Sequence, residues 1–311
     1  MSELESKQVP VDDVSFFANV FSFMGLPLSR DLEPDDLDAV VMGVPYDLAT
    51  SGRAGTRSGP QGIRQASANL AWEERRWPWS FALADSLKAI DYGDVEFLYG
   101  DSDDMLEQVE AHAARITGAG KVLVSLGGDH FVTLPLLRGH AKAHGKMALI
   151  HFDAHTDTYD EENKYNHGCM FARAPEEGII DPSKSIQIGI RTNYDRPRHE
   201  YEVIDAHIAN EQPVAETVAA IRARVGDEPA YLTFDIDCLD PAFAPGTGTP
   251  VVGGLSTSRV LRILQGIADL NIVGFDVVEV SPAYDHAEVT ALAGASLALE
   301  FLYMIATRKK S

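Results

Sequence analysis

The sequence predicts an α/β fold with three layers, α/β/α, around a mostly parallel central sheet. Short, near-continuous apolar runs recur along the chain, as in strands buried on both faces of a parallel sheet. Segments with helical features separate these runs, and such alternation is typical of a three-layer α/β domain. No Ser/Gly/Pro-rich linker or internal repeat interrupts the pattern. Residues 14–311 are therefore expected to form a single domain.

Seven apolar runs are predicted to be strands of this sheet. Most are rich in Val, Ile, Leu or Phe and are short enough to cross a sheet once. They cover residues 39–44, 87–91, 122–126, 148–152, 185–190, 230–234 and 272–278.

Helices are expected between the strands. One is expected to open at Ser58-Gly-Pro60, because proline is well suited to the first helical turn. The others are expected over residues 131–145, 213–226 and 256–269, followed by a long last helix over residues 288–306.

The first residues are expected to lie outside this pattern. Residues 1–13 are polar and acidic, and are predicted to form a flexible arm. The apolar segment 14–28 is interrupted by Asn19, Gly25 and Pro27. It could pack on the domain or on a neighbouring subunit.

The charge balance narrows the classes of partner. The chain of 311 residues has 47 acidic and 26 basic side chains, which give a formal net charge of −21. Such a surface repels nucleic acid and anionic lipid, and attracts cations at long range. A cationic substrate or a divalent metal is therefore favoured over a polyanion or a membrane. On charge alone, however, an ordinary acidic surface of a soluble protein is the first explanation.

Cysteine usage and hydropathy suggest a cytoplasmic protein. Cys169 and Cys238 are too few for a disulfide framework and suit a reducing compartment. No apolar run is expected to reach the roughly 20 residues of a membrane-spanning helix. The N-terminal residues lack the basic start of a secretory signal.

Three of the predicted strands end in residues that can bind metal. The run 122–126 leads to His130, 148–152 leads to Asp153-Ala-His155-Thr-Asp157, and 230–234 leads to Asp235-Ile-Asp237. Alternate residues of an extended segment share a face, so each group can converge. The carboxyl ends of parallel strands also form the usual ligand crevice. A single Asp-x-Asp or histidine is commonly structural, but three such groups at strand ends predict a metal centre.

The donor set indicates the kind of metal. Four carboxylates and two imidazoles suit a first-row divalent ion such as Mn²⁺, whereas structural zinc sites favour thiolates. Carboxylates so crowded would repel each other without cations. Two ions that share bridging carboxylates could use all six ligands and still leave room for substrate.

Three segments resemble the signatures of the ureohydrolase superfamily, which includes arginases and agmatinases. They are Gly-Gly-Asp-His at 127–130, Asp-Ala-His-Thr-Asp at 153–157 and Asp-Ile-Asp-Cys-Leu-Asp-Pro at 235–241. The resemblance extends from about Val41 to the last helix, and segments 51–55, 244–250 and 277–282 are most similar to bacterial agmatinases. It implies an arginase/deacetylase-like fold, two Mn²⁺ per subunit, and a trimeric or hexameric homo-oligomer.

The resemblance also implies a reaction and a role for each ligand. A metal-bridging hydroxide would attack the guanidinium carbon of agmatine, and collapse of the intermediate would yield putrescine and urea. Asp153 and Asp235 would bridge both metals. His130 and Asp157 would complete one metal site, and His155 and Asp237 would complete the other. Asp157 could also accept a hydrogen bond from the nucleophile.

Further residues are assigned by resemblance to the reaction. Glu279 matches the glutamate that binds the guanidinium, and His167 matches a histidine that protonates the leaving amine. His151 shares a face with Asp153 and is expected to support or pack beside the ligands rather than bind metal. Cys169 replaces the Met or Thr more usual after His-Gly, and could place a thiol near the metals. Cys238 is expected to be buried.

Other functions remain open on the sequence alone. A sister enzyme could act on guanidinobutyrate, another guanidino acid or arginine, whose carboxylate tails call for cationic or amide donors. Two loops are expected over the site, residues 158–166 and residues 48–57. The first contains Asp160, Glu161, Glu162 and Lys164, and the second contains Arg53 and Arg57. The acidic excess in the first loop favours a substrate with an amine tail.

Two more distant alternatives differ in their metal chemistry. An amide deacetylase of related fold would use one zinc, and a non-catalytic protein would close the coordination shell of its metal.

Trp72, Trp77 and Trp79 could recognise a cation, although aromatic clusters more often pack in cores or subunit contacts.

Overall fold

The computed structural model describes residues 22–159, 163 and 165–310. Within these residues eight strands form one sheet, in the order β2-β1-β3-β8-β7-β4-β5-β6, and every neighbouring pair is parallel. The strands are β1 (Ala39–Gly43), β2 (Ala89–Asp94), β3 (Val122–Leu126), β4 (Ala148–Phe152), β5 (Ile186–Ile190), β6 (Glu202–Asp205), β7 (Ala230–Asp235) and β8 (Ile272–Val278).

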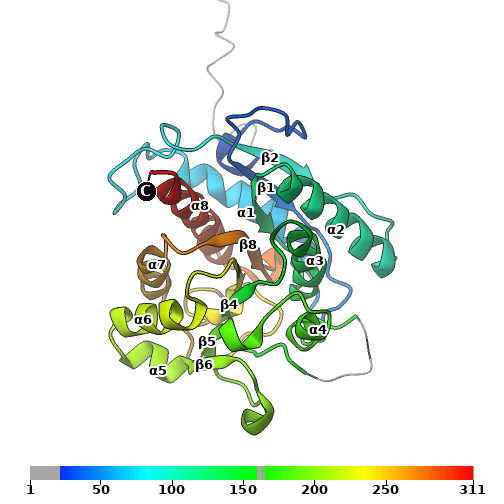
Figure 1. Ribbon diagram of the computed structural model, residues 1–311, viewed down its shortest axis with the longest axis vertical. Coiled ribbons are helices and arrows are strands. Elements are labelled where there is room, and N and C mark those ends of the chain that lie inside the picture. Colours follow the sequence, from blue (N-terminus) through cyan, green and yellow to red (C-terminus); the bar gives the residue numbers. More distant parts are fainter. Residues whose placement is uncertain (1–21, 160–162, 164, 311) are drawn as a thin grey trace, which may run out of the picture.

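Helices cover both faces of the sheet, which confirms the three-layer α/β/α prediction (Figure 1). Apolar side chains of α1, α6, α7 and α8 pack on one face, and those of α2, α3 and α4 pack on the other. The helices are α1 (Gly59–Ser67), α2 (Ser102–Gly118), α3 (Thr133–His144), α4 (Met170–Glu176), α5 (Ala206–Glu211), α6 (Val214–Val225), α7 (Thr257–Gly266) and α8 (Val289–Lys310).

The seven predicted strands are all present, and β3, β4 and β8 have the predicted bounds. The short strand β6 was not predicted, because it lies at the sheet edge and is only partly buried, so its sequence lacks a continuous apolar run. Helices α4 and α5, of seven and six residues, were also not predicted.

The absence of α2 from the sequence prediction was an error. Its buried side chains, Met105, Val109, Ala113 and Ile116, recur at helical spacing. The side chain of Asp101 accepts hydrogen bonds from the first-turn amides of Asp103 and Asp104, as an N-cap should. Helix α2 packs closely on α3, where a Cβ on Gly139 would lie only 2.5 Å from that of Ala113.

Helix α8 corrects the expectation that no segment is apolar enough to cross a membrane. By length and composition its residues Val289–Lys309 meet that condition, but 83% of the most apolar window is buried inside the fold. The helix packs against α1 and the sheet, so its apolar character comes from its position in the core.

The predicted flexible arm, residues 1–13, and most of segment 14–28 lie outside the described residues. The prediction that residues 14–311 form a single domain stays a prediction, which the one continuous sheet supports.

Candidate metal centre

The predicted metal ligands gather at the carboxyl edge of four central strands. His130 follows β3, Asp153 follows β4, and Asp235 is the last residue of β7, while β8 lies between β3 and β7. Because all four strands are parallel, the residues that follow them meet at one edge of the sheet. The six side chains are buried, apart from that of His155, which is 20% exposed.

Two groups of donors lie within reach of a metal ion. In the first, Nδ1 of His130 lies 3.1 Å from Asp153 Oδ2, 2.9 Å from Asp157 Oδ2 and 3.3 Å from Asp235 Oδ2. In the second, Nδ1 of His155 lies 3.3 Å from Asp153 Oδ1 and 3.1 Å from Asp237 Oδ2. Asp153 belongs to both groups and directs one oxygen to each. The structure thus brings all six predicted ligands together.

The hydrogen bonds around His130 test whether a cation fits the first group. Thr233 donates its hydroxyl proton to Asp276 Oδ1 at 2.6 Å, so its oxygen accepts from Nε2 of His130 at 2.9 Å. This leaves Nδ1, which has no hydrogen-bond partner in the described part of the chain, directed at three carboxylate oxygens. Such a convergence of electron pairs fits a shared cation.

The pKa values of the cluster support the same conclusion. Burial, with the charges of Asp237 and Asp153, raises the pKa of Asp235 well above its usual value. Burial alone would lower the pKa of His130, but its contacts with Asp153, Asp157 and Asp235 raise it well above 6.5. Without a cation the cluster must therefore hold protons, which a bound metal would displace.

His167 and Glu279 form a pair beside the first donor group. Nδ1 of His167 donates to Glu279 Oε1 at 2.8 Å, and the backbone amide of His130 donates to the same oxygen at 2.9 Å. Glu279 Oε2 is buried and has no hydrogen-bond partner among the described residues. One carboxylate oxygen is therefore left without a partner among these residues, although Glu279 does not line the cavity described below.

The second ring nitrogen of His167 faces the loop at Ser51. The Ser51 amide donates to Nε2 at 3.0 Å, and Ser51 Oγ lies 2.7 Å from the same nitrogen. Burial alone would lower the pKa of His167, but Glu279 raises it to about 9. The Ser51 amide acts in the opposite direction, because it needs an unprotonated nitrogen.

A cavity of about 220 Å³ opens over the two donor groups. It is lined by Ser51, His155, Asp157, Tyr159, Asn166, His167, Gly168, Asp235 and Thr249. Cys169 is buried, and its thiol contacts the carbonyl of Asn166 at 3.1 Å rather than lining the cavity. Cys238 is buried, as predicted.

Arg53 and Arg57, in the loop over the site, are both held by other groups. Arg53 donates to the Thr247 carbonyl at 2.8 Å, and its guanidinium lies 4.3 Å from the centre of the Tyr284 ring. Arg57 forms an ion pair with the buried Asp47. The charged residues predicted in the other loop, Asp160, Glu161, Glu162 and Lys164, lie outside the described residues.

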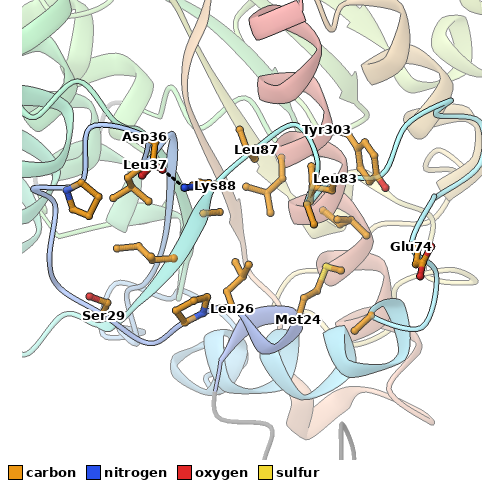
Figure 2. A pocket seen from close by; sticks show the side chains of 18 of the residues that line it. Met24, Leu26, Ser29, Asp36, Leu37, Glu74, Leu83, Leu87, Lys88 and Tyr303 are labelled. Atoms are coloured by element: carbon orange, nitrogen blue, oxygen red, sulfur yellow. Dashed lines mark hydrogen bonds and ion pairs between the residues drawn. The ribbon is translucent and has the colours of Figure 1, made fainter. Parts of the chain in front are cut away.

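The three tryptophans do not line this cavity. Trp72 and Trp77 are 62% and 84% exposed, while Trp79 stacks on Tyr303 at 5.4 Å between ring centres. Tyr303 borders a separate apolar pocket of about 640 Å³, which Met24, Leu26, Leu83 and Leu87 also line (Figure 2). That pocket contains none of the predicted metal ligands.

Several side chains that support the ligands were missed by the sequence reasoning. Thr233 and Asp276 orient His130, Gln187 contacts His151, and Arg191 holds the turn that carries Asp237. Most are polar residues inside otherwise apolar strands, and this feature of the sequence could have marked them as partners of the ligands. Their partners depend on the register between strands, which the sequence pattern does not specify.

Comparisons with known proteins identify the family of this chain. The chain matches the arginase family over residues 37–304. It is 57% identical to an agmatinase from Photorhabdus laumondii over 96% of this chain and 97% of that protein.

Solved structures share the fold. A hypothetical agmatinase from Burkholderia thailandensis superimposes with a TM-score of 0.91 at 47% identity, covering 96% of this chain and 94% of that one. Proclavaminate amidino hydrolase from Streptomyces clavuligerus superimposes with a TM-score of 0.88 at 37% identity, covering 95% of this chain and all of that one. The chain therefore belongs to the arginase family of ureohydrolases.

Proposed function

We propose that this protein is an agmatinase that hydrolyses agmatine to putrescine and urea at a centre of two Mn²⁺ ions. The observation that carries the proposal is the pair of donor groups that share Asp153, next to the free oxygen of Glu279. The agmatinase names of relatives at 57% identity favour agmatine among the guanidino compounds.

The donor set suits manganese, because it combines carboxylates with imidazoles and contains no thiolate. Asp153 and Asp235 would bridge both ions, with His130 and Asp157 at one of them and the remaining pair, His155 and Asp237, at the other. Two such ions would lower the pKa of a shared water and supply a nucleophile near neutral pH. Asp157, which lines the cavity, would orient that water.

Glu279 would bind the guanidinium group of the substrate. Its Oε1 is held by His167 and the amide of His130, so the carboxylate cannot turn freely. Its Oε2 is buried, and a donor group that reached it would form a charge-assisted hydrogen bond out of water. A guanidinium provides such donors together with the opposite charge.

His167 would protonate the leaving amine. It lines the cavity, and its Nδ1 donates to Glu279, which fixes the orientation of the ring. The contact between the Ser51 amide and Nε2 must loosen before both ring nitrogens carry protons. Movement of the Ser51 loop would therefore accompany proton transfer.

The tail of the substrate is proposed to be an amine rather than a carboxylate. Arg53 and Arg57 are the cations of the described loop over the site, and both are engaged by the protein itself. The net charge of −21 would also attract a dicationic substrate.

The experiment compares urea release by the manganese-loaded protein from agmatine, arginine and guanidinobutyrate at equal concentrations. A strong preference for agmatine is expected. Preference for guanidinobutyrate or arginine would move the proposal to a sister ureohydrolase. Release from none of them, with two metals bound, would contradict the proposed substrate class, and one bound zinc would instead favour an amide deacetylase.

We also propose a cytoplasmic homo-oligomer, a trimer or hexamer. Two buried free cysteines are consistent with a reducing compartment. Light scattering of the purified protein would measure its mass against the 33.8 kDa of one chain.

A further inference from the structure

Two buried polar side chains lie beneath the segment that carries Asp153, His155 and Asp157. They are His151 on β4 and Gln187 on β5, which face each other across the two strands. Both are fully buried. Buried polar groups need defined hydrogen-bond partners, so the contacts of this pair can be read one by one.

The side-chain amide of Gln187 can have only one orientation. Its nitrogen lies 2.7 Å from the carbonyl oxygen of Thr156, which can only accept a hydrogen bond. The nitrogen rather than the oxygen must therefore face Thr156. The oxygen then points to Nε2 of His199, from which it accepts a hydrogen bond at 2.7 Å.

This orientation determines which nitrogen of His151 carries a proton. The same amide nitrogen of Gln187 lies 2.9 Å from Nδ1 of His151, so Nδ1 must accept and cannot carry a hydrogen. The ring proton is then on Nε2, which lies 2.7 Å from Asp153 Oδ2. A protonated nitrogen donates a hydrogen bond and does not bind metal.

Distance alone would allow a different reading. His151, His130, Asp153 and Asp157 lie close enough together to hold one ion. The contact with Gln187 argues against His151 as a ligand, because Nε2 could bind metal only if its proton moved to Nδ1. There it would face the hydrogens of the Gln187 amide.

We propose that Gln187 and His151 are positioning residues of the metal centre. Gln187 sets the tautomer of His151, and His151 donates from Nε2 to Asp153, the carboxylate shared by both donor groups. Gln187 also holds the Thr156 carbonyl, between His155 and Asp157. One amide thereby aligns three ligands. This inference rests on the proposed metal centre.

A matched pair of variants at His151 tests the inference. In His151→Gln the side-chain amide nitrogen can replace Nε2 as the hydrogen-bond donor to Asp153. In His151→Leu the leucine side chain has a volume similar to that of histidine but has no donor. Binding of Mn²⁺ alone is measured by equilibrium dialysis with metal analysis, and the electron paramagnetic resonance signal of the coupled pair is recorded. We expect His151→Leu to bind about 10- to 100-fold more weakly and His151→Gln to stay within about threefold of the wild type.

Other outcomes overturn the inference. Equal losses in both variants would mean that His151 binds metal directly, and no loss in either would mean that it does not position Asp153. Circular dichroism checks that each variant folds. If His151→Leu does not fold, Gln187→Leu decides: about tenfold weaker Mn²⁺ binding is expected, and wild-type binding would contradict the role of Gln187.

Failure of the proposed function would look different. A wild-type protein that binds two Mn²⁺ but releases no urea from agmatine would contradict the proposed reaction. The metal affinities of the His151 and Gln187 variants would still test their positioning role.

Discussion

At the scale of single residues, the candidate site contains conformations and environments that its side chains rarely adopt. Glu279 and Asp157 have φ angles of 64° and 49°, in the left-handed region that favours glycine. Each such residue costs on the order of 1 kcal/mol or more, so the surroundings must hold it in place. For Glu279, its amide donates to the Gly128 carbonyl at 2.8 Å, and its side chain accepts from His167.

Replacing Glu279 by glutamine should remove the charge and keep the shape. We expect Glu279→Gln to reduce kcat/KM for agmatine by at least about 100-fold, because a buried charge-assisted hydrogen bond to the guanidinium is lost. Steady-state urea release gives the rate, and metal analysis of the same sample should still find two ions. Turnover close to wild type would contradict the role of Glu279.

His140 should make the fold sensitive to acid. Burial lowers its pKa from 6.5 to about 4. Nδ1 donates to the Leu136 carbonyl, and Nε2 has no hydrogen-bond partner among the residues that the structure describes. Above pH 6.5 the ring is neutral in both states and has no effect. As the pH falls towards 4, His140 binds a proton in the unfolded chain but stays neutral in the folded protein. This difference should lower the free energy of unfolding by up to about 3 kcal/mol.

His140→Met tests this dependence, since it keeps a side chain of similar volume and cannot titrate. Urea unfolding at pH 7.5 and pH 5 should show that wild type loses more stability on acidification than the variant does. Equal losses in the two proteins would show that His140 does not contribute.

At the scale of elements, short turns after the strands carry the metal ligands, and other side chains hold these turns in place. The turn Ile236–Cys238 carries Asp237. Arg191 follows β5 and donates to the carbonyl oxygens of Asp237 and Val251, each at 2.6 Å. A planar guanidinium can bind several carbonyl oxygens at once, whereas a lysine ammonium cannot match that geometry.

Arg191→Lys should therefore weaken metal binding although the charge is kept. We expect about tenfold weaker Mn²⁺ binding, because the turn that carries Asp237 is less well held. Arg198→Lys is the matched control. The side chain of Arg198 is 88% exposed, so this substitution should leave Mn²⁺ binding unchanged. Unchanged affinity in Arg191→Lys would contradict the role of Arg191.

The strands and helices also show which parts of the fold could be predicted from the sequence. Strands β3, β4 and β8 were predicted to the residue because their apolar runs end at glycine or charged residues. The ends of β3, β4 and β7 carry all six candidate ligands to one edge of the sheet, and their role as metal ligands stays a prediction. Helix α2 was missed although its apolar spacing and Asp101 cap were visible, whereas Gln187 could not be assigned because its partners depend on the register of β4 with β5.

At the scale of the whole molecule, the metal centre should couple to stability. Four carboxylates of the candidate site are buried together in a chain with a net charge of −21. A bound cation offsets their repulsion in the folded state but has little to bind in the unfolded chain. At 100 times the dissociation constant, each site adds about 2.7 kcal/mol of stability.

Removal of metal should accordingly lower the melting temperature. Differential scanning calorimetry of the chelator-treated protein is compared with the same sample after Mn²⁺ is restored, and we expect the transition to return upward. Added NaCl at matched ionic strength is the control, because screening acts weakly on buried charges. A transition that does not respond to Mn²⁺ would contradict a metal centre at the carboxyl edge of the sheet.

The place of β8 in the sheet has a consequence for the order in which the protein can assemble. Strands β1–β3 form one contiguous group and β4–β7 another, and β8, the last strand of the chain, lies between them. His130 belongs to the first group, while the other ligands follow strands of the second. On the ribosome, the two groups can each begin to form, but they cannot join until residues 272–278 emerge. The complete centre can therefore be loaded only after β8 has been synthesised.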